Sequence, residues 1–579
     1  MYKKFFYFSL SFYFLIFLSH GNIFIVKTKS SNKIIKNKII NCLYDIKNED
    51  ILDKIIFKKK TEKIVKNCLR SIGYYYPKIN IKYSSPKKNR NIITIYVVQG
   101  DFIKMLDSKI ILNGDSKNDT DYNAWIKNNF PKIGSQLNHY KYEKFKQGLL
   151  DISIKKGYFD ADFEVSELQV FPNYNVARWF IVFNSGYRYR FGKINFYGSK
   201  IHKSYLKNIS NNYYNKLYNI ELISDLNNKL ISTNWFNSVT VSPDIYNNSK
   251  YKNVVPLNVI LSPNNKNRLE VGLGYNSRNK FHITSYLEIP WINSLGHSIK
   301  NKLYFSIYEK IFNLKYKIPI IKNPINEYYL LQSQIKNFYL NQYKYRSITF
   351  NISKNWNIND NFKKSINIYF VLDNYIVNNF KIKKKILIYP SFQINKINYD
   401  EISFPFFGLN QNYEFNLSNK IFGSSVNFFM LKVNNTFINT YLEKHRYIIR
   451  NNIGYIFTNF SNDIPSSMKF FAGGDKSIRG FKYKTLSSLD KDNNVIGSLK
   501  LFTISLEYQY NFYKNLWFAL FVDNGDASDS LNYKNLHTGI GLGIRWPANF
   551  GTIKLDIAKP ISFFKENSLE FYIGLGSEL

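Results

Sequence analysis

The second half of the chain, from about residue 265, alternates apolar and polar side chains with a period of two. Because successive side chains of a strand point to opposite faces, each segment has one apolar, aromatic face and one face of polar residues or glycine. Repeated segments of about ten residues with this pattern, separated by turn residues, are typical of a transmembrane β-barrel. The alternation is clearest in 268–275, 502–510, 539–546, 552–558 and 569–575.

The length of this half predicts the number of strands. At roughly 20 residues for each strand and its connection, with ~10 residues for each crossing, residues 265–579 suit about sixteen antiparallel strands. An even number keeps both ends of the barrel on the same side of the membrane. A soluble β-sandwich is the alternative, and it is disfavoured because no second break in composition interrupts this length.

The stretch Gly539-Ile540-Gly541-Leu542-Gly543 could be mistaken for a dinucleotide-binding loop. It lacks the spacing of that motif and the helix that should follow it. Its period of two instead places all three glycines on one face of a strand. We therefore interpret it as part of the barrel.

A different pattern occurs three times in the first half of the chain: an amphipathic helix, a Gly or Asn, aromatic residues and then a strand. The copies are evenly spaced, since 84 positions separate Gly73 from Gly157 and 77 separate Gly157 from Asn234. A second β-like run closes each copy, which predicts three small α+β domains of order β-α-α-β-β. The predicted domains are 22–100, 101–187 and 188–264, with helices at 61–72, 142–156 and 221–232 and closing strands at 91–98, 177–184 and 254–261.

The first 21 residues have the pattern of a secretory signal peptide. Lys3 and Lys4 precede an uncharged apolar run, and Ser19 and Gly21 occupy the −3 and −1 positions of a cleavage site. The run is short for a membrane-spanning helix, and a short N-terminal anchor is the alternative. Removal of 1–21 would leave an exported chain without a transmembrane helix, so insertion into a membrane would use strands.

Composition and charge fit the predicted barrel and do not indicate a catalytic or ligand-binding site. Aromatic residues make up 18% of the 579 residues, a level that suits sheets with rings at a bilayer boundary. The net charge of +39 would suit phosphate binding, but the basic residues are scattered along the whole sequence, so we expect no nucleic acid partner. The seven histidines show no ligand spacing and no nucleophile lies beside a base, so we predict no metal, no cofactor and no enzymatic activity.

Cys42 and Cys68 both fall in the first predicted domain. An exported location permits a disulfide between them. Two free, buried thiols are equally compatible with the sequence. The pairing therefore stays open at this stage.

The most specific signal is the run 470–483, FFAGGDKSIRGFKY. Its Arg479-Gly480-Phe481 tripeptide, late in the predicted barrel, resembles the superfamily of BamA, TamA and the two-partner secretion transporters. The longer run resembles the TamA family, the outer-membrane subunits of the translocation and assembly module. Similar fragments follow in the family's order along essentially the whole mature chain. They include 138–163, 184–192, 234–239, 505–510 and 571–579.

The resemblance implies three periplasmic polypeptide-transport-associated (POTRA) domains and a loop that folds back into the barrel lumen. It places Arg479 in that loop, packed against Glu507 and Asp523 on neighbouring strands. The period of two independently puts Glu507 on the polar face, and an arginine in a narrow lumen needs acidic partners. Gly480 and Phe481 complete this expected lumen lock, with Gly480 allowing a tight backbone path. A solvated loop arginine is the alternative.

The resemblance also implies a weak seam between the first and last strands, here 268–275 and 568–575. Glycines in the last strand would weaken its order. The chain ends in Leu579, where many outer-membrane barrels end in Phe or Trp, and the TamA family shares this departure. The expected seam residues are Leu269, Val271 and Leu273 on the first strand and Phe571, Ile573, Gly574 and Gly576 on the last.

The resemblance therefore predicts an insertase of the bacterial outer membrane, with its POTRA domains in the periplasm. Its expected partners are unfolded β-barrel clients such as autotransporters, outer-membrane lipid, and a TamB-like periplasmic protein anchored in the inner membrane. Clients would pair with exposed sheet edges and with the opened seam, because an edge offers unpaired backbone groups to any extended chain.

Three alternatives remain. A two-partner secretion transporter of the same superfamily would export a polypeptide through the barrel and would carry two periplasmic domains and a plug helix. A passive porin or receptor barrel would lack the periplasmic repeats. The repeats themselves could form a spacer array that does not contact clients.

Overall fold

The computed structural model describes residues 23–28, 33–46, 54–84, 92–245, 253–277, 279–340, 343–377, 381–401, 404–489, 495–530, 536–548, 551–561 and 569–576. The predicted signal peptide lies outside the described residues. The chain divides into two compact units. The first takes the residues up to 193, the second takes 257–579, and the segments between are shared by the two.

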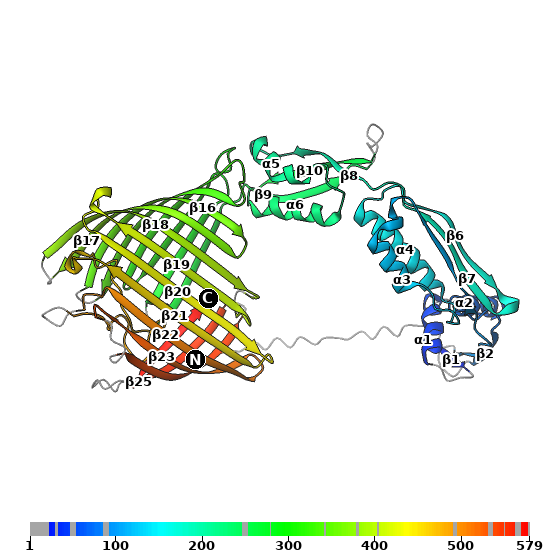
Figure 1. Ribbon diagram of the computed structural model, residues 1–579. Helices are drawn as coiled ribbons and strands as arrows, with labels where there is room; N and C mark the ends of the chain where they lie inside the picture. The colour runs from blue at the N-terminus through cyan, green and yellow to red at the C-terminus, as the bar shows by residue number, and fades with distance from the viewer. Residues whose placement is uncertain are drawn as a thin grey trace, which may run out of the picture. The chain divides into compact units, whose positions relative to one another are not determined.

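The first group of elements is a three-stranded sheet with two helices (Figure 1). The sheet has the order β1-β3-β2, with β1 parallel and β2 antiparallel to β3. Ile39, Val65 and Ile95 are fully buried in its core, and a disulfide joins Cys42 to Cys68. The elements are β1 (Ile23–Thr28), α1 (Lys33–Cys42), η1 (Tyr44–Ile46), α2 (Lys54–Arg70), β2 (Lys78–Ser84) and β3 (Ile92–Val98).

The helix predicted at 61–72 is shifted in the structure. It begins at Lys54, because Phe57 and Thr61 continue the buried stripe of Val65 by one helical step each. The Thr61 hydroxyl donates to the Phe57 carbonyl oxygen at 2.8 Å, which satisfies this polar group inside the core. The helix ends at Arg70, and Gly73 follows with a φ of 91°.

The second group repeats the order of two helices between strands, with β6 antiparallel and β5 parallel to β7. Its long helix begins where the Asn138 side chain accepts hydrogen bonds from the backbone of Tyr140 and Lys141, and it ends at the left-handed Gly157. The short strand β4, which also pairs with β7, was not predicted. The elements are β4 (Lys104–Met105), β5 (Lys109–Asn113), η2 (Asp115–Asn118), α3 (Thr120–Asn129), α4 (His139–Lys156), β6 (Asp162–Phe171), η3 (Pro172–Tyr174) and β7 (Val176–Asn184).

The third group has the sheet order β8-β10-β9. Trp235 is buried, and its indole Nε1 donates to the Gly296 carbonyl oxygen at 3.0 Å. The side-chain amide of Asn208 donates to the Ile321 carbonyl oxygen at 2.7 Å. None of the helices among the described residues combines the length and apolar character needed to cross a bilayer. The elements are β8 (Arg190–Tyr197), α5 (Lys203–Ser210), η4 (Asn211–Tyr213), α6 (Ile220–Ser232), β9 (Phe236–Pro243) and β10 (Val254–Pro263).

The remaining strands form one antiparallel sheet of 16 strands, which confirms the predicted number (Figure 1). Strands that are consecutive in sequence are neighbours throughout the sheet. The strands are β11 (Arg268–Asn276), β12 (Lys280–Ile289), β13 (Ser298–Ser306), β14 (Glu309–Pro319), β15 (Glu327–Leu340), β16 (Tyr343–Asn359), β17 (Phe362–Val377), β18 (Lys381–Tyr399), β19 (Gly408–Ser418), β20 (Phe428–Tyr441), β21 (His445–Phe457), β22 (Lys500–Tyr513), β23 (Leu516–Ser528), β24 (His537–Ala548), β25 (Gly551–Pro560) and β26 (Glu570–Gly576).

The two faces of this sheet differ as the alternation predicts. On β17 the outward Ile366 and Ile368 are about half exposed, whereas the inward Ser365 and Asn367 are buried. The Asn367 amide donates to the Ser365 hydroxyl at 3.0 Å, so these two inward polar groups satisfy each other. An apolar outer band around a polar interior is the arrangement of a membrane-embedded barrel.

The disulfide should stabilise the first group of elements. A bridge that closes a loop of 26 residues is expected to contribute about 3 kcal/mol by restricting the unfolded chain. Reduction of the full-length protein should therefore accelerate hydrogen exchange in α1 and α2, measured by mass spectrometry. A Cys42→Ser/Cys68→Ser variant is the control and should show the fast exchange with or without reductant. Equal exchange in the reduced and oxidised protein would contradict this role.

Candidate functional site: the lumen loop and the barrel seam

Residues 458–499 connect β21 to β22, and we call them the lumen loop. The loop doubles back on itself, since Phe470 pairs with Ser498 and Ala472 pairs with Leu486. The Ser467 hydroxyl donates to the carboxylate of Asp373, a fully buried residue on the inner face of β17. The loop therefore reaches the polar interior of the barrel.

Arg479 lies at the centre of the loop's contacts and is 2% exposed. Its Nε and Nη2 donate to the two carboxylate oxygens of Asp523 at 2.7 and 2.9 Å, a bidentate pair. Its backbone N–H also donates to Asp523, at 2.9 Å. The guanidinium lies over the Phe521 ring, 3.3 Å from its centroid. The buried charge is thus held by fixed partners on β23.

Glu507 on β22 is the second acid at this position. Its Oε2 lies 2.8 Å from Arg479 Nη1 and 2.9 Å from Arg450 Nη2. Its Oε1 accepts from Arg545 Nη2 at 2.8 Å, and Arg545 also contacts Asp556 at 2.5 Å. We call these residues the charge cluster. Its described members are Arg450, Arg479, Arg545, Glu507, Asp523 and Asp556, three cations and three anions.

Because these opposite charges are equal in number, the cluster is neutral as a whole. Each ion buried in the lumen loses its hydration, and only close pairing offsets that loss. Removing one member would leave an uncompensated buried charge, which typically costs about 3–5 kcal/mol. The cluster therefore holds the loop in one position, as long as all its members stay in place.

Three glycines on β24 make room for this arrangement. A Cβ on Gly539 would lie 1.8 Å from the Arg479 carbonyl oxygen, and a Cβ on Gly543 would lie 1.9 Å from Asp556 Oδ1. A Cβ on Gly541 would lie 2.4 Å from the Phe521 ring. The alternating glycines thus form the floor on which the loop and the cluster rest.

The loop continues from the cluster toward the last strand. Gly480 has a φ of 96°, and a Cβ there would lie 2.9 Å from the backbone of Lys559. Phe481 is 7% exposed and packs edge-on against the His537 ring, 5.2 Å between centroids. The Tyr572 hydroxyl on β26 donates to the Phe481 carbonyl oxygen at 2.9 Å and accepts from the Gly480 N–H at 3.0 Å.

The first and last strands, β11 and β26, are the two ends of the sheet, and we call the line between them the seam. Within the described residues, no ladder of backbone bonds joins them. Their backbone contact is at Ser277, whose N–H donates to the Ile573 carbonyl oxygen at 3.1 Å and whose hydroxyl accepts from the Ile573 N–H at 2.7 Å. By contrast, β11 pairs with β12 along its whole length.

The seam residues expected from the sequence lie along these two strands. The side chains of the first strand are strongly exposed: Leu269 66%, Val271 66% and Leu273 78%. On β26, Phe571 and Ile573 face outward, while Gly574 and Gly576 lie on the inner face with Tyr572. Gly574 has no atom closer than 4.0 Å to an added Cβ, so the last strand is loosely packed at its end.

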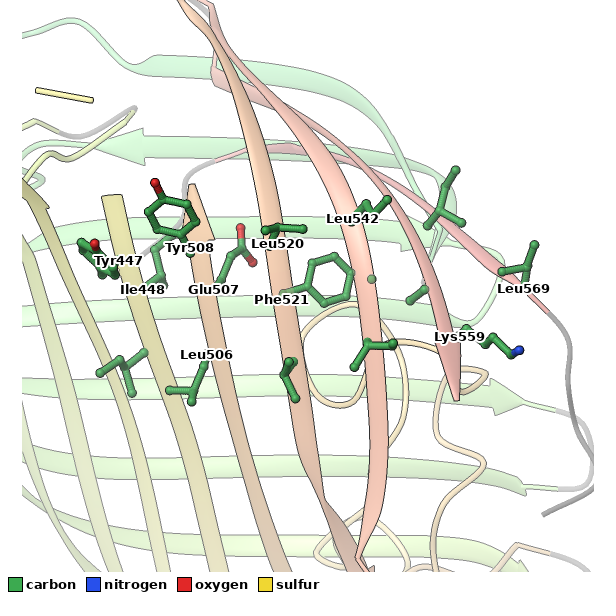
Figure 2. Close-up of a pocket in the computed structure, with 16 residues that line it drawn as sticks. Tyr447, Ile448, Leu506, Glu507, Tyr508, Leu520, Phe521, Leu542, Lys559 and Leu569 are labelled. Atoms are coloured by element: carbon green, nitrogen blue, oxygen red, sulfur yellow. The ribbon is translucent and has the colours of Figure 1, made fainter. Parts of the chain in front are cut away.

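Two hollows border these elements. An apolar groove of about 880 Å³ lies on the outer face of β21–β25, where Figure 2 shows Tyr508, Leu520 and Leu542 on three neighbouring strands. Leu569, which directly precedes β26, also lines it. A polar cavity of about 560 Å³ lies inside the barrel, lined by the charge cluster, the loop and Tyr572. The cluster and the last strand therefore border the same polar space.

Sequence reasoning identified Arg479, Glu507 and Asp523 but missed Arg450, Arg545, Asp556 and Tyr572. The available signal was the period of two, which places Arg545 and Asp556 on the same face as the alternating glycines. A buried Arg446 was also missed; its Nε donates to the Pro405 carbonyl oxygen at 2.9 Å. Among the described residues, no group of His, Cys, Asp and Glu has the arrangement of a metal site.

Gly539→Ala should release the lumen loop, because the new methyl group would displace the Arg479 carbonyl. We expect trypsin to cleave the loop of this variant in intact cells at least about tenfold faster, a change of about 1.4 kcal/mol. Gly272→Ala is the matched control, since no atom lies within 4 Å of a Cβ there. Parental cleavage rates in Gly539→Ala would show that the glycine does not support the loop.

Comparison with known proteins agrees with this architecture. Residues 264–579 match the Omp85 superfamily domain. Residues 189–264 match the POTRA family, described as a surface antigen variable number repeat. The outer membrane protein assembly factor BamA of Nitratidesulfovibrio vulgaris (strain Hildenborough) is 30% identical over 115 residues, which cover 19% of this chain and only 14% of that protein.

A solved structure shows the same fold. BamA from Haemophilus ducreyi lacking POTRA domains 1–3 has a TM-score of 0.69 at 17% identity, over 82% of this chain and 99% of that one. CdiB from Acinetobacter baumannii has a TM-score of 0.43 at 14% identity, over 91% of this chain and 99% of that one, which is too distant to add to the comparison. Because the Omp85 match spans more than half of the chain and coincides with the 16-stranded barrel, this protein belongs to the Omp85 superfamily, outer-membrane proteins of protein assembly or secretion.

Proposed function

We propose that this protein is a TamA-type assembly factor, which helps β-barrel proteins such as autotransporters to enter the bacterial outer membrane. The observation that carries the proposal is the seam. Within the described residues, β11 meets β26 through Ser277 instead of through a ladder. A barrel that only conducted solutes would gain stability from a full ladder at this position.

The open edge has a physical cost that a client strand would remove. In hydrocarbon no water satisfies a free N–H or C=O group, and each unsatisfied group costs several kcal/mol. An incoming strand that pairs with β11 satisfies the edge and its own backbone at the same time. The last strand, short and rich in glycine, gives way more easily than a full-length ladder would. No bond chemistry is required, so the proposed function is not enzymatic.

The three α+β groups would act as POTRA domains in the periplasm. In each group the last two strands follow the two helices, and one strand (two in the second group) precedes them. The strands β2, β6 and β9 lie at the edges of their sheets. Such edges offer unpaired backbone groups to an extended client. By analogy with the TamA family, the first group would engage a TamB-like protein anchored in the inner membrane, and the barrel would contact outer-membrane lipid.

A covalent seam should stop client assembly. We expect a Ser277→Cys/Ile573→Cys pair, cross-linked in a Cys42→Ser/Cys68→Ser background, to lower the yield of folded client at least about tenfold, because a closed edge cannot pair. The measurement is the heat-modifiable, folded form of a client barrel on gels. Reduction of the cross-link should restore the yield.

The control pair is Leu287→Cys/Asn301→Cys, which joins β12 to β13 across an existing ladder. This cross-link should leave client assembly unchanged. Full assembly by the protein with a closed seam would refute the proposed route. Depletion in cells distinguishes the remaining alternative: loss of one exported polypeptide, with outer-membrane barrels unaffected, would identify a two-partner secretion transporter.

A further inference from the structure

The lumen loop and the seam strand share a direct connection, the Tyr572 hydroxyl. This hydroxyl bonds two consecutive residues of the loop, donating to the Phe481 carbonyl oxygen and accepting from the Gly480 N–H. The loop residues come from the β21–β22 connection, whereas Tyr572 belongs to β26. Tyr572 lies 91 positions after Phe481 and 92 positions after Gly480 in sequence, so both hydrogen bonds are tertiary contacts.

Tyr572 is held so that its hydroxyl points at the loop. The side chain is 7% exposed and packs with Phe521 and Ala558 on the inner face of the barrel. Phe521 also lies under the Arg479 guanidinium. The tyrosine ring and the Arg479 guanidinium therefore both pack against Phe521, while the tyrosine oxygen reaches the loop segment that follows Arg479.

The loop lies close against the barrel wall at this point. Gly480 passes so close to the end of β25 that a Cβ would meet Lys559 and Pro560 at 2.9 and 3.0 Å. If the loop lifts, the Tyr572 hydroxyl loses both partners. If β26 moves away from β25, the same two bonds break from the other side.

We propose that Tyr572 couples the seating of the lumen loop to the position of the last strand. When the loop occupies its position in the lumen, its bonds to Tyr572 hold β26 against the barrel wall. When β26 is displaced, the loop loses these two bonds. By thermodynamic reciprocity, fixing either element must stabilise the other by the same factor. This inference rests on the proposed opening of the seam. It adds a condition for that opening: the loop must be released before the last strand can move freely.

Tyr572→Phe removes the hydroxyl and keeps the ring, so it tests the bonds and not the packing. It leaves the Gly480 N–H and the Phe481 carbonyl without their partner in a buried place, and each lost hydrogen bond weakens seating several-fold. Tyr375→Phe is the matched control. Tyr375 is 3% exposed on β17, its aromatic cluster packs against Phe471 of the loop, and its hydroxyl makes no hydrogen bond among the described residues.

The reporter of loop seating is Ala472→Cys. Ala472 is fully buried in the cluster that contains Phe481, so a thiol there reacts only when the loop leaves its seat. The full-length protein in outer-membrane vesicles is labelled with a membrane-impermeant maleimide. We expect Tyr572→Phe to raise the labelling rate at least about tenfold, and Tyr375→Phe to leave it unchanged.

Reciprocity gives the second measurement. Cross-linking Ser277→Cys to Ile573→Cys fixes β26, and it should slow labelling of Ala472→Cys in a protein that keeps Tyr572. In the Tyr572→Phe variant the same cross-link should have no effect on labelling. If Tyr572 only stabilised the loop, Tyr572→Phe would raise the labelling rate of Ala472→Cys, but the cross-link would still slow labelling in that variant.

Two outcomes would overturn the coupling: parental labelling in Tyr572→Phe, or an equal effect of the cross-link with and without the hydroxyl. Both are measured without a client protein. Failure of the coupling therefore leaves the assembly proposal intact, and failure of client assembly leaves the coupling intact.

Discussion

Inside a bilayer every backbone N–H and C=O group must find its partner within the protein, and the architecture of this barrel follows from that requirement. Fifteen pairs of neighbouring strands meet it with continuous antiparallel ladders. The seam is the exception, held at Ser277. A protein that keeps one such edge in its wall retains a place where another strand can be added.

Contacts in the barrel interior limit the movement of the last strand at this seam. A neutral set of three arginines and three acids fixes a loop from the β21–β22 connection, and the glycine floor of β24 brings the loop close enough for the contacts to form. Neutrality matters because the cluster borders a polar cavity next to the last strand. At this border each arginine of the cluster keeps a close carboxylate partner.

Much of this architecture was accessible from the sequence. The period of two predicted the barrel, and the length of that half predicted about sixteen strands. The resemblance brought Arg479 together with Glu507 and Asp523. The loose seam between β11 and β26 was not visible in the pattern, because Leu269, Val271 and Leu273 alternate like the residues of any paired strand. The Cys42–Cys68 bridge needed the distance between two helices, and Tyr572 needed the path of a loop 91 residues away. Tertiary contacts of this kind leave no periodic trace in a sequence.

The contacts of the third α+β group carry a mechanical consequence. Trp235 and Asn208 hold it to the turns that connect β12 to β13 and β14 to β15, on the side of the sheet where it begins. A pull on that group would reach the barrel through these two turns and through residues 264–267, which join β10 to β11. The strands that carry Glu507, Asp523 and Arg545 lie at the opposite end of the sheet order. Tension on this group would thus load the first strands of the wall, whose residues Asn276, His282 and Tyr304 border the same polar cavity as the charge cluster.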